Sequence, residues 1–318
     1  MLTRNGTTLV KGDEYEFSAE KPESLSIASF DAATAILCYS DGCSRGLHNY
    51  AKFCPSDGSD RSYNRPYKCC ALGVSGMSIS QDSMAEHDET PLSSEQHGTE
   101  GSVAVLDAHT ALVCYRSRPC AVCGVYSEDS VYASWCNVLN RTGTSLVTDV
   151  AARVRIGSRY ELPRALAAVD STHAVLCARN STSIDGYRKV MCFGLRLHSS
   201  LNLTVGAGFA LHDSFSFYSP GAMAAVNFGG SSDAFICLED EPYPGARCHD
   251  RTHGACHLLS LDTATLQLSK GDEIRVSGSG LSLRQPLVTF FDSTTAAVCY
   301  SGNACPDGVC STHQWYAH

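Results

Sequence analysis

The chain is 318 residues long, 43% apolar and acidic, with a formal net charge of −9 and no cluster of Lys or Arg residues. This charge excludes nucleic acid as an expected partner. No run of 18 or more apolar residues occurs, so we expect no membrane insertion. The 26 glycines, the many Ser and Thr residues and the lack of long helical periodicity are typical of a turn-rich all-β chain.

Residues 29–40 contain a pattern that recurs along the chain. An apolar run ends in an Asp-containing turn, and a second apolar run follows that carries a cysteine near its end. Turn-forming residues between two β-prone runs predict a hairpin. The cysteines of the copies are spaced by roughly 60 residues, apart from a longer first interval. The five copies are residues 29–40, 105–115, 168–177, 225–237 and 290–301, of which the copy at 225–237 is looser and has Asn227 in place of the Asp.

Each copy continues with a second half. A further cysteine opens an apolar run, and a turn leads to one more short strand, so one repeat is predicted to be four strands. The fifth copy ends after its third strand, residues 310–316, while residues 11–14 repeat the Lys-Gly-Asp-Glu sequence of residues 270–273 in the fourth copy. The N-terminal segment 7–14 is therefore predicted to supply the missing strand, which closes the ring without a free edge.

We therefore predict an all-β chain that folds as one five-bladed β-propeller of four-stranded antiparallel blades. Its N-terminal strand completes the last blade and closes the ring. The domain covers residues 1–318, with blades at about 25–90, 101–160, 164–218, 221–280, and 286–318 plus 1–17.

Seventeen cysteines, many at matching places in the repeats, indicate an oxidising compartment. Antiparallel neighbours hold cysteines within disulfide distance, so each bridge is predicted to join the second and third strands of one blade. Cys69 remains an alternative to Cys70, and the odd total leaves at least one thiol free or bonded to another chain. The predicted pairs are Cys38–Cys70, Cys114–Cys136, Cys177–Cys192, Cys237–Cys256 and Cys299–Cys310. Pairing stays open for Cys43, Cys54, Cys69, Cys120, Cys123, Cys248 and Cys305, with Cys43–Cys54 as one candidate.

Four N-glycosylation sequons agree with a secreted, extracellular protein. They begin at Asn5, Asn140, Asn180 and Asn202. Met1 is followed by Leu-Thr-Arg-Asn, which is no apolar signal segment. We therefore expect that a leader is missing from this sequence, or that the sequence is a segment of a longer secreted chain.

Residues 248–257 form the densest group of potential metal ligands, with Cys and His at spacings that suit Zn²⁺. Cys256 is already assigned to a disulfide, which an oxidising compartment favours, so we predict no metal and no cofactor. The carboxylates at 239–241, 57–60 and 82–95 are interpreted as solvated loop charges rather than Ca²⁺ ligands.

No motif indicates an enzyme. A propeller-shaped glycosidase needs two carboxylates that face each other, and nothing in the spacing points to such a pair. The recurring Asp31, Asp107, Asp170 and Asp292 are interpreted as turn formers. No nucleophile elbow, phosphate loop or His-Glu-x-x-His motif occurs. The chain is therefore predicted not to be an enzyme.

Aromatic side chains are the remaining candidates for a binding site, since sugar faces stack on Tyr and Trp. A Tyr follows the second-strand cysteine in three repeats, and a Trp lies just before or within two third strands. The alternative is packing between sheets, because Ala178 and Leu238 replace the Tyr in the other two repeats. The candidate residues are Tyr39, Tyr115, Tyr300, Trp135 and Trp315.

The whole chain resembles the small secreted β-propellers, and in blade number it is similar to the five-bladed lectins of the tachylectin-2 kind. The resemblance lies in the architecture, because the repeats here are longer and cysteine-stapled, and no binding residues are carried over. It implies sugar binding at one pocket per blade. The first hypothesis is therefore a non-enzymatic, multivalent, lectin-like module whose partners are glycans or other extracellular glycoproteins.

A second hypothesis is a structural subunit of an extracellular matrix, coat or filament. It rests on the segment 7–14, which could complete the last blade of a neighbouring molecule instead of its own. Leftover cysteines could lock such contacts, so self-association belongs to this hypothesis.

Overall fold

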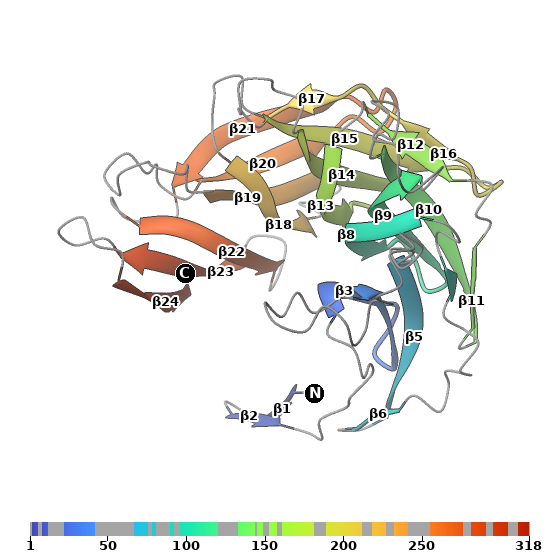
Figure 1. The fold of residues 1–318 in the computed structure, drawn as a ribbon, viewed down its shortest axis with the longest axis horizontal. Coiled ribbons are helices and arrows are strands. Elements are labelled where there is room, and N and C mark those ends of the chain that lie inside the picture. The colour runs from blue at the N-terminus through green and yellow to red at the C-terminus, as the bar shows by residue number, and fades with distance from the viewer. Residues whose placement is uncertain are drawn as a thin grey trace, which may run out of the picture. The chain divides into compact units, whose positions relative to one another are not determined.

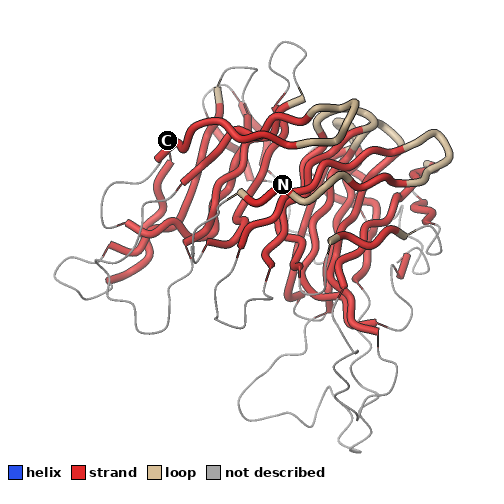
Figure 2. The backbone as a smooth tube through the Cα atoms, turned by 90° about the horizontal axis from the view of Figure 1, so that it is seen from above, coloured by secondary structure: helices blue, strands red, loops and turns tan. Residues whose placement is uncertain are grey.

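A computed structural model describes most of the strands of this chain and the turns that join some of them. Every regular element among the described residues is a strand, and no helix there could cross a membrane (Figure 2). The chain divides into two compact units, Met1–Arg155 and Ile156–His318. The described residues are 2–5, 8–11, 22–41, 67–75, 78–80, 90–91, 96–119, 133–143, 145–148, 153–157, 161–180, 189–211, 218–226, 232–240, 255–275, 281–290, 295–304 and 311–317.

Unit 1 contains a two-stranded ribbon and two antiparallel sheets (Figure 1). The first sheet has the order β3-β4-β5-β6 with β7 beside β5, and the second has the order β11-β10-β9-β8 with β12 beside β10. The strands are β1 (Leu2–Asn5), β2 (Thr8–Lys11), β3 (Pro22–Ser29), β4 (Thr34–Asp41), β5 (Tyr67–Ser75), β6 (Ser78–Ser80), β7 (Thr90–Pro91), β8 (Gln96–Val105), β9 (Thr110–Pro119), β10 (Ala133–Thr142), β11 (Ser145–Thr148) and β12 (Val154–Ile156).

Unit 2 contains three antiparallel sheets. Their orders are β13-β14-β15-β16 with β17 beside β15, β18-β19-β20-β21, and β22-β23-β24. The strands are β13 (Glu161–Ala168), β14 (His173–Asn180), β15 (Lys189–Leu197), β16 (Leu203–Val205), β17 (Phe209–Ala210), β18 (Tyr218–Val226), β19 (Asp233–Asp240), β20 (Ala255–Leu261), β21 (Leu268–Arg275), β22 (Leu281–Phe290), β23 (Ala296–Ala304) and β24 (Ser311–Ala317).

These sheets confirm the predicted repeat of four consecutive antiparallel strands. The last sheet has three strands in the described part of the chain, and β2 pairs with β1 there (Figure 1). The number of blades and the closure of a ring by the N-terminal segment stay predictions.

The hairpin turns between the first and second strands are built by their recurring Asp residues. Oδ1 of Asp107 accepts hydrogen bonds from the amides of His109 and Thr110 at 2.7 and 2.8 Å, and Oδ1 of Asp31 accepts one from Ala33 at 2.8 Å. Asp170 accepts the same bonds in the third repeat. Asp favours such turns because its short carboxylate satisfies the next amides along the chain. The residues therefore act as turn formers.

The second strands read as continuous apolar runs because both of their faces are buried. In β9, all five residues from Ala111 to Tyr115 are buried. One face belongs to a cluster that joins the two sheets of unit 1, where the rings of Tyr67 and Tyr115 stack with centroids 5.8 Å apart. A Cβ atom on Gly101 would lie 2.5 Å from the Tyr67 ring, so glycine leaves room for this stack. The cluster consists of Phe30, Ile36, Cys38, Tyr67, Cys69, Ala71, Val103, Ala111, Val113, Tyr115, Leu139 and Leu146.

The first two sheets of unit 2 are joined by a comparable apolar cluster. Leu266, in the turn between β20 and β21, is 3% exposed and has a φ of 60°. A Cβ atom added to Gly194 would lie 2.8 Å from the carbonyl oxygen of Leu266, and one added to Gly206 would lie 2.5 Å from it. The close approach of Leu266 therefore needs glycine at both positions. The cluster consists of Val169, Val175, Cys177, Val190, Cys192, Leu211, Ala234, Ile236, Leu238, Leu259, Leu261, Leu266 and Leu268.

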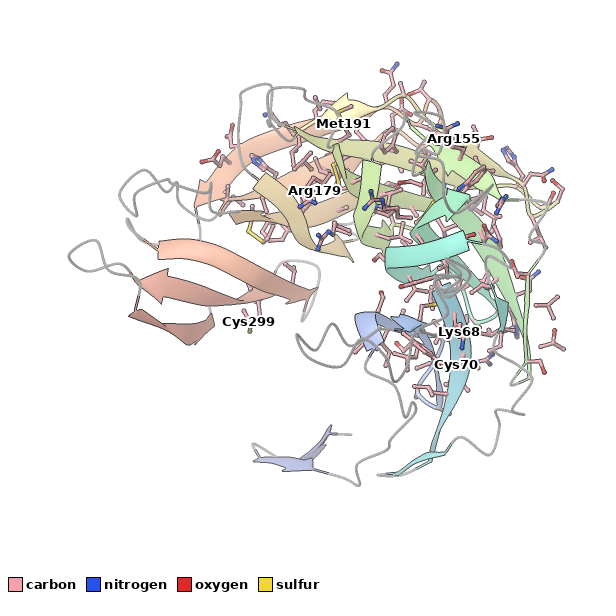
Figure 3. All side chains as sticks on the ribbon, in the orientation of Figure 1. Lys68, Cys70, Arg155, Arg179, Met191 and Cys299 are labelled. Carbon is pink, nitrogen blue, oxygen red and sulfur yellow. A yellow bond between two sulfur atoms is a disulfide. The ribbon has the colours of Figure 1, made fainter. Side chains whose placement is uncertain are left out.

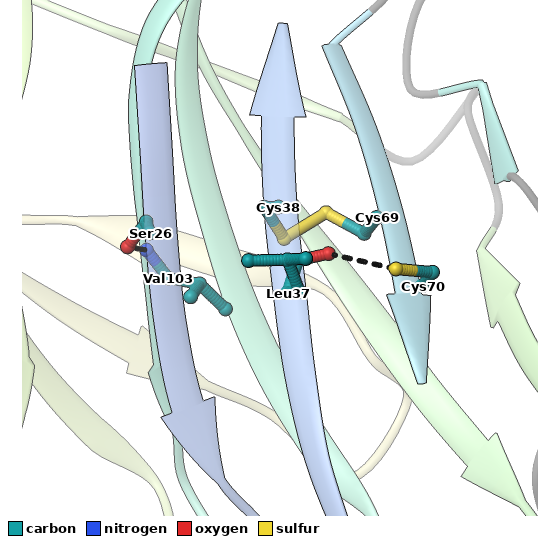
Figure 4. The surroundings of a disulfide bond; sticks show 6 residues. All are labelled: Ser26, Leu37, Cys38, Cys69, Cys70 and Val103. Carbon is teal, nitrogen blue, oxygen red and sulfur yellow. Dashed lines mark hydrogen bonds between the residues drawn. A yellow bond between two sulfur atoms is a disulfide. The ribbon is translucent and has the colours of Figure 1, made fainter. Parts of the chain in front are cut away.

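Each of the first four sheets carries one disulfide between its second and third strands. Three of them join the cysteines that the repeat alignment pairs, Cys114–Cys136, Cys177–Cys192 and Cys237–Cys256. The fourth joins Cys38 to Cys69, which corrects the predicted Cys38–Cys70 pair (Figure 4). Cys310 of the predicted Cys299–Cys310 pair lies outside the described residues. The loop cysteines whose pairing was left open, apart from Cys69, lie outside them as well.

Strand register explains the correction. Cys38 lies directly opposite Cys69, whereas Cys70 lies opposite Leu37. Successive side chains of a strand point to opposite faces of the sheet, so a shift of one residue turns the thiol away from its partner. The Cys70 sulfur lies 3.6 Å from the carbonyl oxygen of Leu37 (Figure 4).

Candidate functional site

Two of the predicted aromatic residues lie together where β9 and β10 approach the loop that joins them. Tyr115 pairs with Trp135 across the two strands. The guanidinium carbon of Arg153 lies 4.4 Å from the Trp135 ring centroid, within the range of a cation–π contact. We call Tyr115, Trp135 and Arg153 the indole site.

The electrostatics of the indole site follow from its burial. Burial raises the pKa of Tyr115 to about 12, against the opposing charge and hydrogen bond of Arg153. The Tyr115 phenol is therefore protonated at neutral pH and acts as a hydrogen-bonding group rather than as a phenolate. Trp135 is half-buried, so part of its surface reaches solvent.

Asn137 lies two residues after Trp135, on the same face of β10. It is 1% exposed, and neither polar atom of its side-chain amide has a hydrogen-bond partner within the described part of the chain. The same holds for the indole Nε1 of Trp135. Buried amides and indoles normally find a partner, so this face of β10 favours a polar group against it.

The other three predicted aromatics lie elsewhere. Tyr39 is 3% exposed and packs with Leu37, Leu72 and Cys70, the last of which Figure 3 labels near β5. Tyr300 lies opposite Tyr316, and Trp315 lies opposite Ser301, in the pairing of β23 with β24. The side chains of Tyr300 and Trp315 lie outside the described residues. Ligand binding by the five aromatics stays a prediction.

A second polar group lies at the turns of unit 2. Nδ1 of His173 lies 2.9 Å from Oδ2 of Asp170, and Nε of Arg196 donates to Nε2 of His173 at 3.1 Å. Nη2 of Arg196 donates to the Ala264 carbonyl oxygen at 3.1 Å, and the positive charge of Arg196 also acts on Asp262. We call Asp170, His173, Arg196 and Asp262 the turn cluster.

Both carboxylates of the turn cluster favour the ionised form. Partial burial opposes the charge of Asp170, but hydrogen bonds from Thr172 and His173 outweigh it and hold the pKa of this carboxyl below its usual value. Hydrogen bonds from the Thr265 side chain and the Ala264 amide lower the pKa of Asp262 in the same way. A general acid of a glycosidase needs a raised pKa, so neither carboxylate suits that role.

A similar contact in unit 1 lacks the histidine. Nη1 of Arg141 lies 3.1 Å from Oδ2 of Asp31 and also bonds the hydroxyl of Thr34, and its guanidinium carbon lies 5.0 Å from the Phe30 ring centroid. Hydrogen bonds from Thr34 and from the amide of Ala33, together with Arg141, hold the pKa of Asp31 below its usual value. Arg141 thus links β10 of one sheet to the first turn of the other.

The remaining predicted positions are placed as follows. Cys256, in the candidate zinc sequence, is bonded to Cys237, and the neighbouring His257 is 2% exposed. Burial and the charge of Lys270 lower the pKa of His257. Asn202 is exposed in the turn after β15, and Asn140 is half-buried on β10. Glycosylation at the four sequons stays a prediction.

Sequence reasoning missed Asn137, Arg153, His173 and Arg196. Arg153 is 18 residues from Trp135, and Arg196 is 23 residues from His173, so no short-range sequence pattern predicts these contacts. One signal was present for His173. The other repeats with an Asp turn have Thr at its position, namely Thr34, Thr110 and Thr295.

No protein-family model matches the sequence, and no curated protein matches it either. A solved structure of NanB with Optactamide aligns with a TM-score of 0.51 and 6% identity over 93% of this chain and 55% of that one. A mutant NanB sialidase from Streptococcus pneumoniae aligns with a TM-score of 0.47 and 8% identity over 79% of this chain and 35% of that one. The Bombyx mori GH32 β-fructofuranosidase BmSUC1 aligns with a TM-score of 0.45 and 10% identity over 90% of this chain and 55% of that one.

The chain thus spans about half or less of the length of these three proteins. NanB, which aligns with a TM-score of 0.51, is a sialidase and not a lectin, and this contradicts the expectation of a non-enzymatic, tachylectin-like module and the expectation that the chain is not an enzyme. The same finding overturns the alternative of a structural subunit. Four disulfides fit a protein of an oxidising compartment. At 6% identity the likeness to NanB shows the fold alone, and this chain has a propeller-like all-β fold of antiparallel four-stranded sheets.

Proposed function

We propose that this chain is a secreted, carbohydrate-active enzyme of the glycoside hydrolase kind. The observation that carries the proposal is the fold likeness to NanB, which extends over 93% of the chain. The related solved structures include a sialidase and a β-fructofuranosidase, so the substrate class proposed is an oligosaccharide or a glycoconjugate. Secretion is supported by the four disulfides.

The indole site is the part of unit 1 that we propose to bind the sugar. Trp135 offers a half-exposed aromatic face of the kind on which sugar rings stack. Arg153 supplies a guanidinium above that ring, and the fully buried Tyr115 holds Arg153 through a hydrogen bond. Trp135 and Arg153 then position a glycan through stacking and hydrogen bonds. The carboxylates of the turn cluster serve the fold, since their pKa values are lowered and their hydrogen bonds lie within turns.

Hydrolysis of a panel of fluorogenic glycosides and oligosaccharides tests this function. We expect turnover of at least one glycosidic linkage by the disulfide-intact protein. Trp135→Ala should lower kcat/KM at least about fivefold, since stacking contacts of this kind are worth on the order of 1 kcal/mol or more. Arg153→Gln tests the site with a smaller change of packing.

Leu72→Met is the control, because Leu72 lies in a different cluster of unit 1 and methionine nearly conserves the volume of its side chain. It should leave kcat/KM within about twofold of the unchanged protein. Absence of turnover on every linkage would refute the proposed function. Turnover that is unchanged in folded Trp135→Ala and Arg153→Gln would refute the site alone.

We also propose that the repeats form five blades and that β2 supplies the fourth strand beside β24. The repeated Lys-Gly-Asp-Glu sequence supports this, because Lys270 and the three residues after it lie in β21, which is the fourth strand of its sheet. The same sequence begins at Lys11, which is the last residue of β2.

Proline substitutions on β2 and β1 separate a blade strand from a simple ribbon. Thr3 and Val10 face each other in the ribbon, so proline at either position disturbs that pairing. Val10→Pro should lower Tm by roughly 2–4 °C because it also disturbs the pairing with β24, whereas Thr3→Pro should not. Equal melting temperatures for the two variants, measured by circular dichroism, would argue against this role of β2.

A further inference from the structure

His173 occupies a place that belongs to threonine in the other Asp turns of this chain. The second strand begins there in the first three repeats, where Thr34 and Thr110 start β4 and β9 as His173 starts β14. A histidine changes its charge in mildly acidic solution, whereas a threonine does not. The substitution therefore adds a titratable group to this one turn.

The hydrogen bonds of His173 require the neutral imidazole. Nε2 accepts a hydrogen bond from Nε of Arg196 at 3.1 Å, and a ring nitrogen accepts only while it carries no proton. The proton of the neutral ring then lies on Nδ1, which donates to Oδ2 of Asp170 at 2.9 Å. The His173 side chain is 12% exposed, so water replaces these partners only in part.

Arg196 also forms a hydrogen bond with the neighbouring sheet β18–β21. The same guanidinium donates to the carbonyl oxygen of Ala264, in the turn between β20 and β21. Leu266 of that turn packs against Gly194 and Gly206 of the sheet that holds His173. His173 thus positions Arg196, which makes the hydrogen bond to the Ala264 carbonyl between the two sheets.

From this geometry we infer that His173 makes the contact between the sheet β13–β16 and the turn from Asp262 to Leu266 sensitive to acid. A proton on Nε2 turns this atom from an acceptor into a donor, so the hydrogen bond from Arg196 is lost and two cations face each other. Asp170 keeps its bond to Nδ1 and supports the imidazolium. Arg196 then leaves the ring and holds the Ala264 carbonyl less firmly.

The charged groups around His173 act in both directions: the carboxylates of Asp170 and Asp262 favour a positive ring, whereas Arg196 opposes it. Asp170 lies in its own turn, Arg196 on β15, and Asp262 in the turn of the facing sheet. His198, the next histidine on this side of β15, bonds the hydroxyl of Thr204 at 2.8 Å instead. The hydrogen bond from Arg196 is therefore present when Nε2 carries no proton and is lost when Nε2 is protonated.

Amide hydrogen exchange within the turn that Arg196 holds reports the loss of this contact. The amide of Leu266 donates to the Asp262 carbonyl at 2.7 Å, and the amide of Asp262 donates to the Gln267 carbonyl at 2.9 Å. We expect the protection factors of these two amides, corrected for intrinsic exchange, to fall about tenfold between about pH 7.5 and about pH 5.5.

His173→Thr is the matched variant, since it restores the residue that the other repeats use. It should remove the pH dependence of both protection factors while the protein stays folded, and Arg196→Met should remove it as well. The amide of Phe30, which donates to the Thr34 carbonyl at 2.9 Å, should show no comparable change in any variant. Equal pH dependence in His173→Thr and the unchanged protein would overturn the inference, and so would pH-independent protection in the unchanged protein.

Discussion

Replacement of Cys69 with Ala is expected to lower the free energy of unfolding by about 3–4 kcal/mol, because it removes the bridge to Cys38. That bridge spans 31 residues, and cross-links that close loops of this length restrict the unfolded chain strongly. Urea unfolding of the otherwise oxidised protein, with the disulfides verified by peptide mapping, measures the loss.

Cys70→Ala is the matched control for this prediction. The substitution removes one buried sulfur atom but no bridge, so the expected loss is about 1 kcal/mol. Cys70 points to the face away from Cys38 and therefore does not replace Cys69 in the variant. A Cys38–Cys70 peptide in the unchanged protein, or equal losses in the two variants, would contradict the assigned pair.

Gly206→Ala is expected to lower the free energy of unfolding by about 2–3 kcal/mol. The new Cβ atom would lie 2.5 Å from the carbonyl oxygen of Leu266 and 2.8 Å from its Cβ atom. Both contacts involve atoms that cannot rotate away, so the turn between β20 and β21 must shift. The same urea unfolding measures this loss.

Gly271→Ala provides the comparison. A Cβ atom there would meet its nearest neighbour, the Leu258 carbonyl oxygen, at 3.6 Å, which is ordinary van der Waals contact. In this strand position alanine should leave stability within about 0.5 kcal/mol or raise it slightly, since it restricts the unfolded chain. If Gly206→Ala proved as stable as Gly271→Ala, the close packing of Leu266 on the neighbouring sheet would be incorrect.

Local turn chemistry made much of the fold predictable from the sequence. The hairpin turns of the first three repeats contain an Asp whose carboxylate accepts hydrogen bonds from the following amides, and the apolar run after Asp107 is buried on both faces. Such signals depend on a few adjacent residues, so they repeat visibly along the chain. The four-stranded sheets and the places of the disulfides follow from them.

Strand register and long-range partners were less accessible. Cys69 and Cys70 are adjacent and both buried, and only the register of β4 against β5 decides which one faces Cys38. The contacts of Arg196 and Arg153 join residues from separate strands, so they depend on how the strands pack. The prediction of a lectin was wrong because it rested on the number of repeats, whereas function depends on the residues of a site.

The arginine contacts of the first and third repeats differ in one respect, which is the presence of a titratable ring. Arg141 bonds Asp31 and Thr34 directly, whereas Arg196 reaches Asp170 only through His173. The turns are otherwise alike in their Asp residue and backbone hydrogen bonds. A single change from Thr to His therefore places a titratable ring between the carboxylate and the guanidinium.

The central claim is that a glycan is a substrate of this protein and not merely a ligand. Mass spectrometry of an oligosaccharide pool after incubation in ¹⁸O-labelled water tests it most directly. We expect shorter products that carry one ¹⁸O atom at each new reducing end, formed by the unchanged protein and strongly reduced in Trp135→Ala. An oligosaccharide pool that is bound by the protein but keeps its original masses would contradict the claim.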